Sequence, residues 1–259
     1  MRALLILPTF QEALNIVEVL DRVRAATPDV HILVVDDGSP DGTADLAEEH
    51  GGVVGDAEVL RRTEKSGLGS AYRDGFRWGL ERGFDVLLEM DSDLSHDPAA
   101  LPSLLGAVEH GADLVIGSRY VPGGSIPAWS WHRRQLSRWG NRYAAGVLGL
   151  AVNDSTAGFR AYRATMLRQV DLDGVAADGY GFQIEMTYEV VRRGGSVVEV
   201  PIAFADRLRG TSKMSSRIVV EALVLVTWWA FRDRLPGGRR RRPRPRRERL
   251  DRRLPRLPG

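Results

Sequence analysis

The chain has 259 residues, of which 43% are apolar and none is cysteine. This length suits one large domain or two small ones, and the lack of cysteine excludes a disulfide framework, a thiolate metal site and a cysteine nucleophile. No apolar run reaches the ~18 residues that a membrane-spanning helix needs, and the apolar start of the chain is too short for a signal peptide.

The formal net charge of +2 conceals an uneven distribution. Residues 232–259 contain 13 arginines and carry a net charge of +10, which leaves about −8 for residues 1–231. The last segment is rich in proline and has few aliphatic residues, so it cannot bury a core and we expect it to be disordered. We therefore divide the chain into a globular domain, 1–231, and an arginine-rich tail, 232–259. The tail either attracts an acidic lipid surface or nucleic acid, or only adds solubility.

Strand and helix patterns alternate along the first half of the chain. Short apolar runs predict strands at residues 3–7, 30–35, 59–60, 85–90 and 114–117. Helical spacing and helix-start signals predict helices over residues 11–25, from 41–43 onward, 69–82 and 99–109. This alternation indicates an α/β fold with a mostly parallel sheet covered on both faces. Ligands of such sheets bind beyond the carboxyl ends of the strands, where the polar motifs of this chain lie.

The second half of the chain is less regular. Residues 128–143 mix aromatic residues with arginines, which fits either an element at a membrane interface or core tryptophans beside solvated arginines. Residues 218–231 predict a largely apolar helix that either covers the core or lies on a membrane. Its length and Glu221 argue against a span.

The most informative motif is Asp91-Ser92-Asp93, which follows the apolar run 84–90. If the strand continues through the motif, the two carboxylates point the same way, roughly 6–7 Å apart. Two like charges this close repel unless a cation or hydrogen-bond donor lies between them. A hard divalent cation that also bridges to a diphosphate would meet this need, whereas a solvated acidic turn is the simpler explanation for an isolated Asp-x-Asp.

Two further motifs follow predicted strands. Residues 36–42 read Asp-Asp-Gly-Ser-Pro-Asp-Gly. An acidic residue in this segment can accept hydrogen bonds from a base or ribose. An acidic turn without a ligand is the alternative interpretation of the same residues. Residues 8–12 offer a stacking ring and a carboxylate, and Thr9 with Glu12 also resembles a helix start. The sequence has no dinucleotide-binding glycine motif and no P-loop.

The 36 basic residues include only two lysines, Lys65 and Lys213. Both lie in predicted loops among small residues, and Lys213 follows Arg207 and Arg209. A compact ammonium and a planar guanidinium are not interchangeable at a phosphate, so three cations within seven residues suit a diphosphate clamp. Chance retention of either lysine is the alternative.

Together these motifs resemble the polyprenol-phosphate mannosyltransferases, which are inverting glycosyltransferases of family two and include the dolichol-phosphate mannose synthases. The resemblance covers roughly residues 3–230. The matching segments, in the order of the family, are residues 8–12, 36–43, 91–93, 117–120 and 207–213. The resemblance implies a GT-A fold, GDP-mannose as donor, Mg²⁺ or Mn²⁺ as cofactor and a polyprenyl phosphate as acceptor.

The resemblance also implies roles for residues. The guanosine site would consist of five residues: Pro8, Phe10, Glu12, Val35 and Asp37. Phe10 replaces the usual tyrosine, so its ring can stack but a hydroxyl contact is lost. Asp91 and Ser92 would contact the nucleotide, Asp93 would bind the metal, and Ser95 stands where relatives often have a glutamine near the metal.

The remaining implied contacts involve cations. Arg119 would meet the mannose or the phosphates, and Arg207 and Lys213 would hold the diphosphate. Arg133 and Ser137 match positions that would bind the acceptor phosphate. An apolar acceptor tail implies a membrane surface as partner, peripheral association with the cytoplasmic face, and room for a membrane-anchoring protein partner.

A lipid phosphate is anionic at neutral pH, so we assign no catalytic base and expect catalysis through positioning and charge stabilisation. Two other hypotheses remain at this point. One is the same chemistry with UDP-glucose as donor, giving a polyprenyl-phosphate glucosyltransferase. The other is a non-catalytic protein that binds a sugar nucleotide or a polyanion; nucleic acid is not expected, because the acidic body would repel its phosphates.

Overall fold

The computed structural model describes residues 1–205 and 216–234. In the second range it describes the side chains of residues 222–232 only. Arg207, Arg209 and Lys213 therefore lie outside the described residues, as does the tail beyond Arg234. The division into a domain and a tail stays a prediction.

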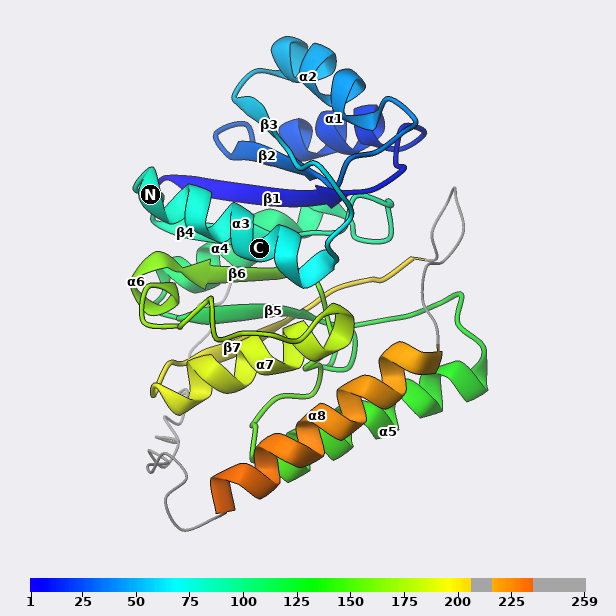
Figure 1. Cartoon of the computed structure of the whole chain (residues 1–259), viewed down its shortest axis with the longest axis vertical. Helices are drawn as coiled ribbons and strands as arrows, with labels where there is room; N and C mark the ends of the chain where they lie inside the picture. Colours follow the sequence, from blue (N-terminus) through cyan, green and yellow to red (C-terminus); the bar gives the residue numbers. More distant parts are fainter. Residues whose placement is uncertain (206–215, 235–259) are drawn as a thin grey trace, which may run out of the picture.

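A seven-stranded sheet forms the centre of the molecule (Figure 1). Its strands are β1 (Ala3–Thr9), β2 (His31–Asp36), β3 (Ala57–Arg61), β4 (Val86–Glu89), β5 (Leu114–Ser118), β6 (Arg160–Arg163) and β7 (Val197–Pro201). They lie in the order β3-β2-β1-β4-β6-β5-β7. All neighbouring pairs are parallel except those of β6, which runs antiparallel to β4 and β5. The predicted α/β class with a mostly parallel sheet is confirmed.

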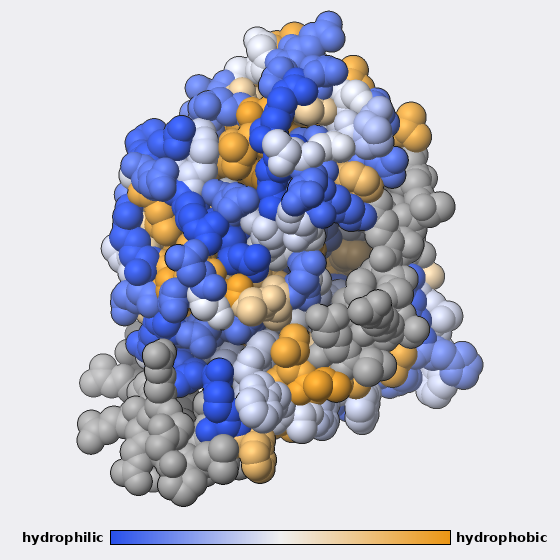
Figure 2. Space-filling view, viewed as in Figure 1, coloured by the Kyte–Doolittle hydropathy of each residue, from blue (hydrophilic) through white to orange (hydrophobic). Residues whose placement is uncertain are grey.

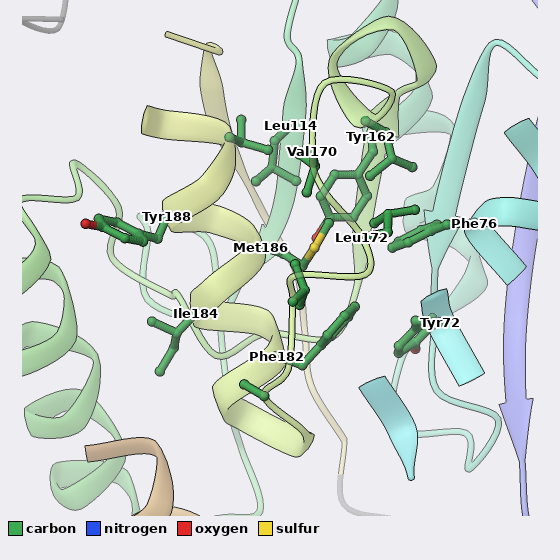
Figure 3. Close-up of a cluster of buried hydrophobic side chains, with 14 of the residues drawn as sticks. Tyr72, Phe76, Leu114, Tyr162, Val170, Leu172, Phe182, Ile184, Met186 and Tyr188 are labelled. Atoms are coloured by element: carbon green, nitrogen blue, oxygen red, sulfur yellow. The ribbon is translucent and has the colours of Figure 1, made fainter. Parts of the chain in front are cut away.

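Helices cover both faces of the sheet. One face packs on α1 (Ile16–Ala26), α2 (Thr43–Val54) and α4 (Leu101–Glu109), which follows the short helix η1 (Pro98–Ala100). The other face packs on α3 (Leu68–Glu81) and α7 (Gly179–Arg192), with the one-turn helix α6 (Ala164–Leu167) beside them. Figure 3 shows the core on this face, where Tyr72, Phe76, Tyr162, Phe182 and Met186 lie together.

Two long helices, α5 (Trp131–Leu148) and α8 (Ser216–Arg234), lie side by side at one end of the molecule (Figure 1). The Tyr143 hydroxyl of α5 meets the Thr227 hydroxyl of α8 at 2.8 Å. The inner face of α8 also packs against α7, where Trp229 stacks on Tyr188 with ring centroids 6.4 Å apart. The predicted helix over 218–231 is thus confirmed and covers part of the core.

Two details differ from the sequence-based expectations. The first helix begins at Ile16 rather than Gln11, and Thr9 does not cap it, because the Thr9 hydroxyl donates to the Asp36 carboxylate at 2.8 Å. The strand expected over 85–90 ends at Glu89, so Asp91 and Asp93 lie in the following turn, where Leu94 has a φ of 64°. Strand alternation therefore does not set the directions of these two carboxylates.

Candidate active site

Three of the segments predicted to contact the donor, residues 8–12, 36–42 and 91–95, lie at the carboxyl ends of β1, β2 and β4. The Ser92 hydroxyl donates to the carbonyl of Pro8 at 2.8 Å, which joins the turn after β4 to the end of β1. The Asp37 amide donates to the Thr9 carbonyl at 3.0 Å, which joins the end of β2 to the same strand. Neighbouring parallel strands thus place segments 8–12, 36–42 and 91–95 at one edge, as their spacing predicts.

Asp37 is buried and paired with a residue that sequence reasoning did not identify. The Arg62 guanidinium donates to Asp37 Oδ1 at 2.5 Å, and the Ser66 amide donates to Oδ2 at 3.3 Å. Burial raises the pKa of Asp37, and the positive charge of Arg62 opposes that rise. Arg62 follows β3 directly, so the third strand end contributes to this side of the site.

Phe10, Glu12 and Val35 differ in what they can offer a ligand. The Lys65 ammonium lies 4.2 Å from the centroid of the half-buried Phe10 ring, a cation–π distance. The carboxylate of Glu12 is buried and accepts a hydrogen bond from the side-chain Nδ2 of Asn15 at 2.8 Å. The Val35 side chain is fully buried in the core, so only its backbone is available to a nucleotide.

The two carboxylates after β4 have different surroundings. Asp93 is buried, and its Oδ1 accepts hydrogen bonds from the Ser95 amide at 3.0 Å and the Ser95 hydroxyl at 2.5 Å. The Asp91 side chain is 34% exposed. Gly158 lies against Asp91, since a Cβ added there would be 3.6 Å from both carboxylate oxygens. In this arrangement Ser95 orients Asp93 through its hydroxyl.

His96 lies on the buried side of this turn. Its ring lies between Phe159 and Phe204, at 5.2 Å from each ring centroid. Burial lowers the pKa of His96 to about 4, so the imidazole is neutral at pH 7 and its Nδ1 can accept from the Asp91 amide at 3.4 Å. The residue supports the turn and has no exposed face for proton transfer.

Asp91, Asp93 and Ser95 all follow β4 closely and carry hard oxygen donors, the chemistry that Mg²⁺ and Mn²⁺ prefer. The described residues hold no cluster of three or more His, Cys, Asp or Glu side chains suited to a metal, so the Ser95 hydroxyl would have to complete the donor set. Asp93 already has one oxygen fixed by Ser95, and Asp91 is partly open to solvent. The residues present therefore fit a divalent cation that keeps further positions for water or a diphosphate.

Arg119 follows β5 and is buried in an ion pair with Asp154. The Arg119 Nε and Nη2 atoms donate to the two Asp154 oxygens, each at 2.7 Å, and the Arg119 amide donates to Oδ2 at 3.0 Å. Burial alone would lower the pKa of Arg119, but the Asp154 carboxylate outweighs burial and holds it above its usual value. A structural ion pair thus occupies much of the guanidinium that the sequence predicts at the sugar or phosphates.

The predicted acceptor residues lie on α5. The exposed Arg133 guanidinium stacks on the Trp129 ring, 3.9 Å from its centroid. One turn later the Ser137 hydroxyl accepts a hydrogen bond from the Tyr120 hydroxyl at 2.7 Å. Tyr120 follows Arg119 directly, so the acceptor positions are fixed next to the end of β5.

Tyr180 is a half-buried residue in the first turn of α7. Burial raises the pKa of its hydroxyl, Arg119 and Arg133 oppose that rise, and Asp91 and Asp154 add to it. No sequence pattern indicates this residue, because the charges that influence it are distant in the chain.

Comparison with known proteins agrees with this geometry. The family model for glycosyl transferase family 2 matches residues 4–171. The chain belongs to glycosyl transferase family 2. The GT-A fold expectation is confirmed by a structure of glucosyl-3-phosphoglycerate synthase from Mycobacterium tuberculosis in complex with Mn²⁺, UDP-glucose and phosphoglyceric acid. It has a TM-score of 0.66 at 19% identity over 89% of this chain and 78% of that chain.

Relatives at higher identity have more specific names. The polyprenol monophosphomannose synthase of Mycolicibacterium smegmatis is 51% identical over 92% of this chain and 90% of its own length. The undecaprenyl-phosphate mannosyltransferase of Micrococcus luteus is 52% identical over 93% of this chain and 99% of its own. The dolichol-phosphate mannosyltransferase of Pyrococcus furiosus is 35% identical over 91% of this chain and 66% of its own. The resemblance to polyprenol-phosphate mannosyltransferases is therefore confirmed.

Proposed function

We propose that this chain transfers mannose from GDP-mannose to a polyprenyl monophosphate, giving a β-linked mannosyl phosphate lipid and GDP. The observation that carries the proposal is that the loop before β6 joins the acidic turn to α5, since Gly158 lies against the Asp91 carboxylate and the Thr156 hydroxyl accepts from Asn141 of α5. A donor site and an acceptor-phosphate site would thus lie next to each other. Two relatives more than half identical over most of both chains are named for mannosyl transfer to, or synthesis with, such lipids.

The donor would lie across the ends of β1, β2 and β4. Pro8 and Phe10 would contact the base, with Glu12, Asp37 and the Val35 backbone completing the guanosine site. Asp91 and Ser92 would contact the rest of the nucleotide, Arg119 would stabilise the side of the site that meets the sugar, and Arg207 and Lys213 would hold the diphosphate. The shielded Asp37–Arg62 pair supports this assignment, because a carboxylate fixed by an arginine can accept ribose or base hydrogen bonds without reorganisation.

Asp93 and Ser95, with Asp91 beside them, would hold Mg²⁺ or Mn²⁺. When bound, such an ion supplies positive charge to the departing diphosphate. The Ser95 hydroxyl fixes one Asp93 oxygen, so the carboxylate is already oriented before a ligand arrives.

The acceptor needs no strong base in this scheme. The second pKa of a phosphate monoester is about 6, so its oxygen is anionic and nucleophilic at pH 7. Arg133 and Ser137 would hold that phosphate on the side of the sugar opposite GDP, and attack from there inverts the anomeric centre. The bond from the sugar to the GDP oxygen breaks as the bond to the lipid phosphate forms, and no proton has to move. The neutral, enclosed His96 is consistent with this scheme.

A membrane surface would deliver the acceptor. Large apolar side chains are exposed along α5 and α8, and they are Trp131, Leu136, Trp139, Val224, Trp228 and Phe231. Arg133, Arg138 and Arg142 are also exposed on α5, as expected of a helix at lipid headgroups. Figure 2 shows apolar residues on the surface around α8. Among the described residues, no helix is both long enough and apolar enough to cross a bilayer.

We infer that this apolar face of α5 and α8 rests on the cytoplasmic side of a membrane. The tail, 232–259, would add attraction to anionic lipids through its arginines. A membrane-anchoring protein remains compatible with the same face.

The proposal is tested by incubating the purified protein with undecaprenyl phosphate, Mn²⁺ and radiolabelled GDP-mannose or UDP-glucose, and separating the lipids by thin-layer chromatography. We expect a labelled lipid from GDP-mannose only. Label from UDP-glucose alone would establish the glucosyltransferase alternative, and donor binding without any labelled lipid would indicate a non-catalytic binding protein.

A further inference from the structure

A short loop connects the acidic turn, the Arg119 ion pair and helix α5. This connecting loop, residues 153–158, precedes β6. Its first two residues are anchored to β7, because the amides of Asn153 and Asp154 donate to the Glu199 carboxylate at 2.8 and 2.9 Å. The loop is also fixed from the protein interior, because the fully buried Arg160 donates to the carbonyls of Ser155 at 2.7 Å and Ala157 at 2.6 Å. It is therefore a fixed part of the fold.

The connecting loop is joined to α5 through Asn141. This side chain is 2% exposed. Its Oδ1 accepts from the Ser155 hydroxyl at 3.0 Å and the Thr156 amide at 3.2 Å. Its Nδ2 donates to the Thr156 hydroxyl at 3.2 Å and to the carbonyl of Ser137 at 3.1 Å. Both donor hydrogens and both acceptor sites of the amide are used, so the position of α5 along this loop is closely specified.

Thr156 links this helix contact to Arg119. Its hydroxyl accepts from Arg119 Nη2 at 2.9 Å and from Asn141 Nδ2, and it lies 3.4 Å from Asp154 Oδ1. One hydroxyl thus joins α5 to the buried ion pair at the end of β5. At the other end of the loop, Gly158 lies against the Asp91 carboxylate.

We propose that Asn141 and Thr156 are positioning residues that set α5 relative to the donor site. The proposal rests on the proposed function where it takes α5 as the helix that binds the acceptor phosphate. Ser137 lies one turn before Asn141 and Arg133 lies one turn further, so a shift of the helix at Asn141 displaces both acceptor residues together. Neither positioning residue is assigned to the reacting atoms. Thr156 also contacts Arg119, but Arg119 has two further bonds to Asp154, and the donor residues at the ends of β1, β2 and β4 have their own contacts.

The test compares Thr156→Val, which keeps the shape and removes the hydroxyl, with Thr156→Ser, which keeps the hydroxyl. Thr27→Val is the matched control, because Thr27 is a buried threonine whose hydroxyl bonds the Val23 carbonyl at the far end of α1. Asn141→Ser, which replaces the amide with a shorter hydroxyl side chain and removes the bonds to Thr156, is the second variant if Thr156→Val does not fold; the same changes in KM and exchange are expected of it. The measurements are calorimetric Kd for GDP with Mn²⁺, KM for undecaprenyl phosphate, and amide hydrogen exchange along α5.

For Thr156→Val we expect a KM for undecaprenyl phosphate raised about tenfold, the loss expected for a hydrogen bond to a charged group. The Kd for GDP should stay within about twofold, and exchange should accelerate in residues 131–141 but not in α1 or α2. Thr156→Ser should restore KM, and Thr27→Val should change neither constant.

A Thr156→Val protein with wild-type exchange in α5 and unchanged KM would overturn the positioning role. Equal changes in the GDP and lipid constants would overturn it as well, because they indicate general loosening. If the wild-type protein transfers no mannose while Thr156→Val still accelerates exchange in residues 131–141 alone, the proposed function fails and the positioning of α5 stands.

Discussion

The donor edge and the acceptor side of this molecule hold their polar groups in different ways. At the ends of β1, β2 and β4, two carboxylates are fixed by neighbours close along the chain, as Ser95 fixes Asp93 and Ser39 fixes Asp36, whereas Asp37 pairs with Arg62, 25 residues later. On the side toward α5, Arg119, which would meet the sugar, depends on Asp154, 35 residues later, and Asn141 depends on Thr156, 15 residues later. The donor edge therefore follows in part from local chain geometry, whereas the acceptor side exists only once the fold has assembled.

This difference suits the two substrates of the proposed reaction. A sugar nucleotide is recognised by loops at strand ends, a placement common to open parallel sheets. A lipid phosphate would have to be met where the protein touches a membrane, which agrees with the proposed acceptor site on a helix with an exposed apolar face. Changes at the donor edge should therefore affect donor binding and chemistry, and changes on the acceptor side should affect the lipid.

The largest effect is expected at Asp93. Asp93→Ala removes the buried carboxylate that would bind the metal, and several kcal/mol of charge stabilisation correspond to a fall in kcat of about a thousandfold. The rate of mannosyl transfer from GDP-mannose is the measurement. Asp97→Asn is the control, because Asp97 caps η1 by accepting from the Ala99 amide at 3.0 Å and asparagine can do the same. Equal losses in both variants would contradict the assignment.

The next effect is expected at Arg133. Arg133→Ala should raise the KM for undecaprenyl phosphate by about 10- to 100-fold, the worth of a charged hydrogen bond to phosphate, while the Kd for GDP stays unchanged. Arg142→Ala, on the same helix and also exposed, should change KM by less than about threefold. If the two variants weaken the lipid equally, α5 attracts phosphate only by its overall charge.

A smaller effect is expected from the apolar face of α8. Val224 and Phe231 are 62% and 56% exposed there. Val224→Ser with Phe231→Ser should lower co-sedimentation with anionic liposomes about tenfold, through lost burial of apolar surface. Transfer to a short-chain acceptor in detergent should not change.

The matched control for this experiment is Leu46→Ser with Val53→Ser. These are two exposed apolar residues on α2, which covers the opposite face of the sheet. The control should sediment with liposomes as the wild type does. Loss of binding in the α2 variant, or none in the α8 variant, would move the membrane contact away from α8.

The smallest effect concerns the pH dependence of stability. Glu185 on α7 is buried and accepts from the Ala177 amide at 3.0 Å. Burial raises its pKa above that of the unfolded chain, Glu189 adds to the rise and Arg232 opposes it. The folded state therefore binds a proton more readily, so stability present below pH 4.5 declines as the pH rises through the folded pKa.

Glu185→Gln removes this titration. Chemical denaturation of both proteins from pH 4 to pH 8 should show a smaller decline for Glu185→Gln than for wild type. Parallel curves would mean that Glu185 is as easily ionised in the folded chain as in the unfolded one.

The same contrast explains how much the sequence could predict. The strand-end motifs around Asp37 and Asp91 were predicted, because an apolar run followed by acidic and glycine residues is a local pattern. Strands β6 and β7 and helix α7 were not predicted. The buried Arg160 and Gln183 interrupt the apolar periodicity of β6 and α7, and each donates a hydrogen bond to a partner distant in sequence.

Arg62 and Asp154 were missed for a related reason. In the sequence each is an ordinary charged residue. Only the fold pairs Arg62 with Asp37 and Asp154 with Arg119. Arg119 is predicted at the sugar or phosphates, but no sequence pattern indicates Asp154, the carboxylate that occupies its guanidinium. The roles of the predicted site residues stay proposals.

We propose that the carboxylates after β4 bind a divalent cation that the departing nucleotide diphosphate needs. The decisive experiment is calorimetry of GDP-mannose with and without Mn²⁺, on wild type and Asp93→Ala. We expect a binding signal that requires Mn²⁺ and disappears in the variant. Equal affinity in the presence of excess chelator, together with undiminished mannosyl transfer under that condition, would contradict it.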